Sequence, residues 1–123
     1  MGRSPLKVSR KTSLDEATLF TTFPEIGTLE EGAAFRRVAE RVQLTRYGCD
    51  CYAYALLAAG QIDVVIEAGL NAYDIHAPIA VIEAAGGILT DWKGGAAHDG
   101  GRVIASATPQ LHAAALELLE SAA

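Results

Sequence analysis

Apolar side chains recur along this sequence with two different periods, and this pattern predicts strands alternating with helices. Residues 17–22 (ATLFTT) form a short β-prone run that ends at Pro24, whereas residues 30–42 carry apolar side chains at helical spacing. Residues 43–47 alternate weakly, which predicts a second strand that Gly48 breaks. The first part of the chain is therefore expected to run strand, amphipathic helix, strand.

The same alternation continues to the end of the chain. An apolar helix is predicted from Asp50 to Gly60, and the β-branched residues 62–67 (IDVVIE) fit a buried strand. After a predicted loop over residues 68–73, the helix expected over residues 74–85 is apolar on nearly every side, which is typical of an interior layer. The remaining predicted elements are strands over residues 88–92 and 103–106 and a terminal helix that begins at Pro109.

This order of elements predicts the fold class. Strands that alternate with helices through short loops favour a three-layer α/β/α sandwich with a largely parallel or mixed sheet. A length of 123 residues suits one domain, which we place at residues 13–123. Residues 1–12 hold four of the ten basic side chains and are expected to form a flexible basic tail outside that domain.

Charge and composition exclude several classes of function. The formal net charge is −5 and the body of the chain is acidic, which argues against a nucleic-acid surface because such a surface needs clustered Lys and Arg. No apolar run is long enough to cross a bilayer and the first residues contain no apolar signal-peptide core, so we expect a cytoplasmic protein without a membrane partner. Cys49 and Cys51 stand too close for a redox or zinc motif and are expected to be reduced, packed thiols.

Asp74 is the first candidate for chemistry. It follows a predicted strand and loop and stands at the start of a buried helix, where backbone N–H groups and the helix dipole favour an ionised carboxylate. An ionised carboxylate is a good ligand for a hard cation, and open α/β folds bind ligands at this edge of the sheet. The alternative is that Asp74 only caps its helix.

The residues around Asp74 resemble a known family. Glu67, followed seven residues later by Asp74 and then by residues 83–87 (EAAGG), resembles the second signature of the inositol monophosphatase superfamily. Here Tyr73 replaces the usual Trp, and the EAAGG segment has one additional alanine. These features, with residues 46–52 (RYGCDCY) and 90–92 (TDW), are most similar to the histidinol-phosphate phosphatase branch, and the resemblance runs from about Val8 to the terminal helix.

The resemblance implies a role for each matching position. Asp74 would be a catalytic carboxylate that binds Mg²⁺, and Glu67 would contact the alcohol part of the substrate. Gly48, Cys49 and Asp50 would form the turn that lines the same pocket. Two carboxylates, Asp50 and Glu67, would suit a cationic amino alcohol better than a neutral polyol.

Each of these residues also has a purely structural alternative. Asp50 could be a helix N-cap, and Glu67 could be the solvated end of a strand. The three histidines, His76, His98 and His112, have no metal-ligand spacing and are expected to face solvent or lie in loops.

The first signature of the superfamily, an acidic D-P-[ILV]-D-G-[ST] turn, is absent from the sequence. The chain is therefore expected to correspond to the C-terminal half of such an enzyme, without the half that supplies most metal ligands. The leading hypothesis is a Mg²⁺-dependent phosphomonoesterase acting on histidinol phosphate, inactive by itself. Alternatives are an inositol monophosphatase or a phosphatase of another small phosphomonoester, and, in another class, a non-catalytic module that forms homo-oligomers through an exposed interface.

Overall fold

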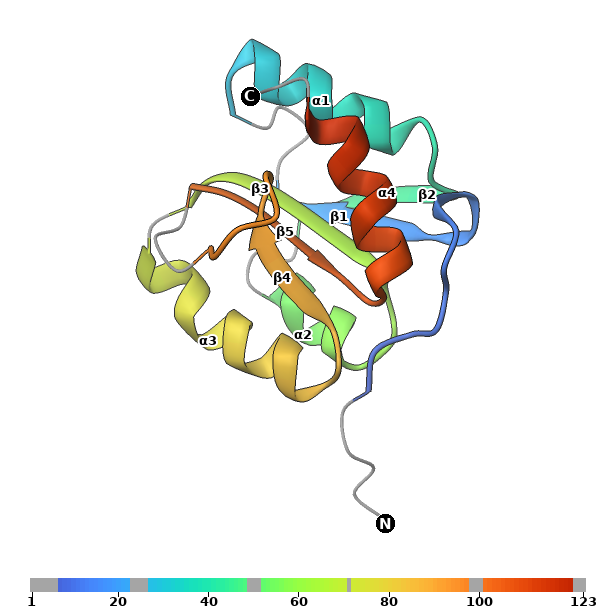
Figure 1. The fold of residues 1–123 in the computed structure, drawn as a ribbon, viewed down its shortest axis with the longest axis vertical. Helices are drawn as coiled ribbons and strands as arrows, with labels where there is room; N and C mark the ends of the chain where they lie inside the picture. Colours follow the sequence, from blue (N-terminus) through green and yellow to red (C-terminus); the bar gives the residue numbers. More distant parts are fainter. Residues whose placement is uncertain (1–6, 23–26, 49–51, 71, 98–100, 121–123) are drawn as a thin grey trace.

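A computed structural model describes residues 7–22, 27–48, 52–70, 72–97 and 101–120 of the chain (Figure 1). Within these ranges, no helix has the length and apolar character needed to cross a membrane. The elements, in chain order, are the 3-10 helix η1 (Leu14–Glu16), β1 (Thr18–Thr21), α1 (Leu29–Ala39), β2 (Leu44–Tyr47), α2 (Tyr52–Ala58), β3 (Val64–Leu70), α3 (Ala72–Ala84), β4 (Ile88–Asp91), β5 (Gly101–Ser106) and α4 (Pro109–Leu119).

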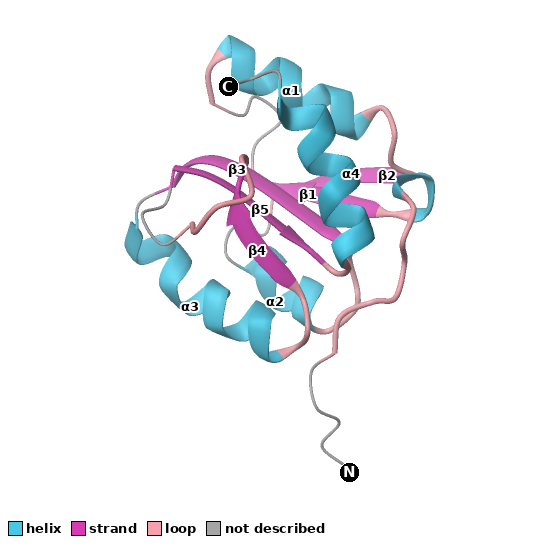
Figure 2. Cartoon of the chain, viewed as in Figure 1, coloured by secondary structure: helices cyan, strands magenta, loops and turns pink. Residues whose placement is uncertain are grey.

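The strands form one mixed sheet in the order β2-β1-β3-β5-β4 (Figure 2). Strands β2, β1 and β3 are parallel, and helical connections link them because parallel neighbours require a crossover. Strand β5 is antiparallel to both β3 and β4. The carboxyl ends of β1, β2 and β3 therefore meet at one edge of the sheet, which we call the carboxyl edge.

Helices cover both faces of this sheet, so the predicted three-layer α/β/α sandwich with a mixed sheet is confirmed. Helices α1 and α4 lie on one face, and α2 and α3 lie on the other (Figure 1). Each face has its own core: Phe35, Val38 and Leu111 belong to the first, and Leu57, Ile75 and Ile82 to the second. The residues of β3 alternate between the two cores, with Val64 and Ile66 in the first and Val65 in the second, because successive side chains of a strand point to opposite faces.

Side-chain caps fix where two of the helices begin. Thr28 accepts a hydrogen bond from the Glu31 N–H while the Glu31 carboxylate accepts one from the Thr28 N–H, so α1 begins with a capping box. At α4, Thr108 caps the helix and Pro109 occupies the first turn, where a missing N–H costs nothing.

The segment predicted as a loop, residues 68–73, differs in the structure. Strand β3 continues to Leu70 and helix α3 already begins at Ala72. Pairing with the antiparallel strand β5 extends β3, since Leu70 pairs with Gly101 beyond a register shift that follows Glu67. Gly69 has φ +77° within this irregularity, a backbone conformation that glycine adopts without strain.

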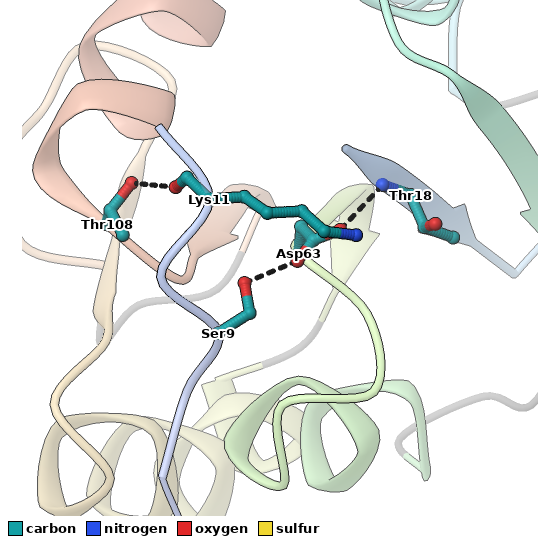
Figure 3. A network of polar contacts seen from close by, with 5 residues as sticks. All are labelled: Ser9, Lys11, Thr18, Asp63 and Thr108. Atoms are coloured by element: carbon teal, nitrogen blue, oxygen red, sulfur yellow. Dashed lines mark hydrogen bonds and ion pairs between the residues drawn. The ribbon is translucent and has the colours of Figure 1, made fainter. Parts of the chain in front are cut away.

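Part of the N-terminal segment also differs from the expected flexible tail. Residues 1–6 lie outside the described ranges, but residues 8–11 run along the edge opposite to the carboxyl edge and form what we call the strap (Figure 3). Val8 donates a backbone hydrogen bond to Ala85 (3.2 Å), and Ser9 and Lys11 bind the carboxylate of Asp63, which is 1% exposed. Because a buried carboxylate needs such partners, Asp63 attaches this segment to the domain.

Candidate functional site

The candidate site lies where the parallel strands end. Thr21 is the last residue of β1 and Tyr47 is the last residue of β2. Glu67 is the central residue of β3, but the pairing of Phe20 with Val65 places it level with the end of β1. Thr21 and Tyr47 are direct partners in the β1–β2 register. The parallel arrangement therefore brings side chains from three separate segments of the chain to the carboxyl edge.

Glu67 is a buried carboxylate held by two hydroxyl groups. Its side chain is 6% exposed, so the alternative interpretation as a solvated strand end is wrong. The Thr22 hydroxyl donates to Oε1 at 2.6 Å, and the Thr21 hydroxyl donates to Oε2 at 3.3 Å. Each oxygen of the carboxylate thus receives a hydrogen bond from the end of the neighbouring strand.

Gly48 joins the same two threonines through the backbone. Its N–H group lies within hydrogen-bond distance of the carbonyl oxygens of Thr21 (3.0 Å) and Thr22 (3.1 Å). Gly48 has φ +102°, and a Cβ at this position would meet nothing within 4 Å. The backbone conformation, and not a lack of space, is therefore what favours glycine here.

Asp74 is the third residue of α3. It is half-buried and lies in the first turn of the helix, which begins at Ala72, so Asp74 is not the N-cap residue itself. Because β3 ends at Leu70 and α3 follows at once, the N-terminus of α3 stands at the carboxyl edge. The partial positive charge of a helix N-terminus stabilises a carboxylate at such a position.

Two of the predicted site residues, Cys49 and Asp50, lie outside the described residues. Of the other three, Gly48 and Glu67 are joined through Thr21 and Thr22, and Asp74 follows the end of the strand that carries Glu67.

The donors available to a metal ion are few. Among the residues that the structure describes, no three His, Cys, Asp or Glu side chains are grouped closely enough to hold a metal ion. Octahedral Mg²⁺ is commonly bound by one or two carboxylates together with water and substrate phosphate. Asp74 fits the role of one such carboxylate, and the described residues do not supply a complete set of ligands.

Two features of the structure were missed by sequence reasoning. The sequence pattern indicates Thr21 and Thr22 only as part of a β-prone run, although a pair of threonines at a strand end is a source of hydroxyl donors.

The second feature is His112, for which the expected exposed or loop position is wrong. It is 5% exposed and lies between Ser106 (Nδ1 to Oγ, 2.9 Å) and Thr90 (Nε2 to Oγ1, 2.7 Å), and burial lowers its pKa to about 4. Its position in an apolar stretch of α4 could have indicated burial. His76 is exposed, as predicted, and His98 lies outside the described ranges.

A cavity of about 920 Å³ lies away from these residues. It is formed by the end of β4, the start of β5 and the last turns of α4, and no residue of the candidate site lines it. Its wall carries both acidic and basic side chains, including Asp91, Lys93, Arg102 and Glu117.

Comparisons with known proteins agree with the sequence resemblance at the level of the family. The model of the inositol monophosphatase family matches residues 1–123. The chloroplastic bifunctional phosphatase IMPL2 of Arabidopsis thaliana is 45% identical over 116 residues, covering 87% of this chain and 34% of that protein. An inositol-1-monophosphatase of Caulobacter vibrioides is 32% identical over 123 residues, covering 95% of this chain and 48% of that protein.

The fold comparison gives the same family. An inositol monophosphatase from Zymomonas mobilis superposes with a TM-score of 0.89 at 35% identity, covering 94% of this chain and 46% of that one. The chain thus spans between about a third and a half of the length of these relatives.

Proposed function

This chain belongs to the inositol monophosphatase family, and from that premise we propose that it contributes the alcohol-binding side and one metal ligand of a phosphatase acting on small phosphomonoesters. The observation that carries the proposal is the meeting of Gly48 and Glu67 at Thr21 and Thr22, beside the helix that begins just before Asp74. A buried carboxylate fixed at the carboxyl edge of the parallel strands is suited to accept hydrogen bonds from an alcohol.

Asp74 is the proposed metal ligand of this chain. Bound Mg²⁺ would supply charge neutralisation at the phosphate and a more acidic water. The residues of this chain would hold the substrate: Asp74 through the metal, and Glu67 with residues 48–50 at the alcohol. The remaining metal ligands that hydrolysis of a phosphate ester needs have to come from the part of the family architecture that this chain does not span.

An inositol phosphate is the first substrate to test. The related proteins of Caulobacter vibrioides and Zymomonas mobilis are named for this activity, which supports inositol phosphate better than the histidinol phosphate expected from the sequence. Inositol phosphate therefore replaces histidinol phosphate as the leading candidate substrate.

Histidinol phosphate is the second candidate. The carboxylates of Asp50 and Glu67 would attract a protonated amine. The relative with 45% identity is named a bifunctional phosphatase, and this name is not restricted to inositol phosphate.

The test is a substrate panel on the full-length gene product. Inositol 1-phosphate, histidinol phosphate and p-nitrophenyl phosphate are assayed with millimolar Mg²⁺ and again with excess chelator. We expect chelator-sensitive release of phosphate, fastest from inositol 1-phosphate. No Mg²⁺-dependent release from any of the three would refute the proposed function.

The choice between the two natural substrates rests on one variant. If an amine is recognised, Asp50→Ala raises KM for histidinol phosphate more than for inositol 1-phosphate, because only the first carries a positive charge. Equal effects on both would leave inositol phosphate as the substrate.

A further inference from the structure

Two adjacent threonines at the end of β1 connect groups that come from the two neighbouring strands. The backbone carbonyls of Thr21 and Thr22 face the N–H of Gly48, which follows β2. The hydroxyls of the same residues donate to Glu67, which belongs to β3. The end of β1, in the middle of the three parallel strands, therefore holds both neighbours at once.

The geometry points to Thr22, assisted by Thr21, as a positioning residue that sets the orientation of the Glu67 carboxylate and through it the selectivity of the site for the alcohol part of its substrate. This inference rests on the proposed function, since it takes Glu67 to face the substrate alcohol.

The two contacts are unequal, and the difference decides which threonine to test. The Thr22 hydroxyl approaches Glu67 at 2.6 Å, within the range of strong bonds between a hydroxyl and a carboxylate, whereas the Thr21 contact of 3.3 Å is long for such a pair. Thr22 is half-buried and Thr21 is 1% exposed. Changing Thr22 therefore removes the stronger bond with less disturbance of the core.

The chemical consequence is a directional preference. A carboxylate has about four acceptor sites and no donor, so Glu67 can accept hydrogen bonds from several groups at once. Fixed in this way, the Glu67 carboxylate preferentially binds substrate groups that donate hydrogen bonds, such as hydroxyls or an ammonium group. It does not stabilise the binding of an ester whose alcohol part has no hydrogen-bond donor, because no hydrogen bond to the carboxylate can form.

The experiment compares Thr22→Val, which removes the hydroxyl at nearly constant shape, with Thr22→Ser, which keeps it. Thr18→Val is the matched control, because Thr18 begins the same strand at the opposite edge, where its N–H binds Asp63 through the backbone. All variants are made in the full-length gene product and assayed on inositol 1-phosphate and on p-nitrophenyl phosphate, which has no donor on its alcohol part.

We expect Thr22→Val to lower kcat/KM for inositol 1-phosphate by about tenfold, mostly through KM, and to change p-nitrophenyl phosphate turnover less than about twofold. Thr22→Ser should restore most of the loss, and Thr18→Val should behave as wild type. An equal loss on both substrates, or no recovery with serine, would overturn the positioning role.

A second readout separates this inference from the proposed function. In protein labelled with ¹³C at the glutamate carboxyl groups, the Glu67 carboxyl resonance, assigned with Glu67→Gln, is compared among the three variants and wild type. Thr22→Val should shift that resonance, and Thr22→Ser and Thr18→Val should leave it near its wild-type position. An unmoved resonance in Thr22→Val refutes the positioning even if the enzyme is active, whereas a shifted resonance in a protein that hydrolyses no substrate leaves the positioning intact and refutes the phosphatase proposal.

Discussion

At the scale of single residues, Asp74 carries the strongest chemical prediction. Its place in the first turn of α3, just after β3, puts a half-buried carboxylate at the carboxyl edge of the sheet. In the proposed phosphatase, Asp74→Asn removes a charge from the metal site at nearly constant volume. We expect kcat/KM to fall at least about a hundredfold while the thermal unfolding midpoint changes little.

The matched control for Asp74→Asn is Asp15→Asn. Asp15 is exposed on η1, a segment that ends before β1 begins at the edge away from the site. Steady-state kinetics in saturating Mg²⁺ and circular dichroism on both variants make the comparison. Near wild-type turnover in Asp74→Asn would exclude this residue as a catalytic ligand.

His112 carries the second prediction at this scale, which concerns stability and pH. Burial lowers its pKa from 6.5 to about 4, so the folded protein binds fewer protons than the unfolded chain between these values. The stabilisation that the neutral, buried His112 side chain provides is therefore complete above about pH 6.5 and is lost as the pH falls toward 4. The shift corresponds to about 3 kcal/mol of unfolding free energy.

Urea unfolding between pH 4 and pH 7 measures this effect. Wild type should lose stability through that window, and His112→Gln, which cannot take up the proton, should show a shallower slope from a lower starting stability. Parallel slopes for the two proteins would contradict the assignment.

At the scale of elements, the prediction concerns the start of α1. One carboxylate oxygen of Glu31 closes the capping box with the Thr28 N–H (2.9 Å), and the other binds Arg102 of β5 at 2.5 Å. Burial raises the pKa of Glu31, but the Thr28 N–H and the Arg102 guanidinium lower it more, so the net pKa lies below 4.5. Glu31 thus joins the helix to the sheet as well as capping it.

Glu31→Ala should reduce the free energy of unfolding by about 1 kcal/mol at pH 7. Because the folded-state pKa is lowered, this contribution is present above about pH 4.5 and disappears as the pH falls below it, so the two proteins should converge in acid. The neighbouring Glu30, exposed in the same turn, provides the control Glu30→Ala. A constant difference at all pH values would exclude the ionised form of Glu31 as the cause.

The elements also show what sequence patterns can predict and what they cannot. The helical spacing of Ala34, Phe35 and Val38 correctly predicted α1 and its buried face. The prediction of a loop over residues 68–73 is wrong. Pairing with β5, which follows some 30 residues later, decides how far β3 extends, and a local sequence pattern carries no information about such a distant partner.

The same limit applies to the site. The sequence pattern predicted Glu67 and Asp74 as candidate site residues. It did not show that Glu67 is buried against Thr21 and Thr22, which come from another strand. Only the sheet order brings these side chains together.

At the scale of the whole molecule, the outer face of α3 is the relevant surface. Ala77, Ala80, Val81 and Ala84 are exposed on it, although this helix was expected in an interior layer. Purified residues 1–123 should therefore form dimers or larger assemblies, because association removes apolar surface from water. The same preparation should hydrolyse phosphomonoesters poorly, since one carboxylate competes badly with full hydration for Mg²⁺.

Light scattering and phosphate release on the same sample measure both properties. Ala84→Glu places a charge at the centre of this face and should shift the solution mass toward the monomer, whereas Ala113→Glu, on the exposed side of α4, should not. A monomer with robust Mg²⁺-dependent turnover would contradict both expectations.

The strap has a consequence for how the protein is made. Ser9 and Lys11 are synthesised before the residues that bind them. Asp63 follows Ser9 by 54 residues, and Thr108, which donates to the Lys11 carbonyl at 2.7 Å, follows Lys11 by 97 residues (Figure 3). Contacts this distant in sequence form late. The strap of a nascent chain therefore stays exposed to proteases until Thr108, at the start of α4, has been synthesised, and it becomes protected when both contacts have formed.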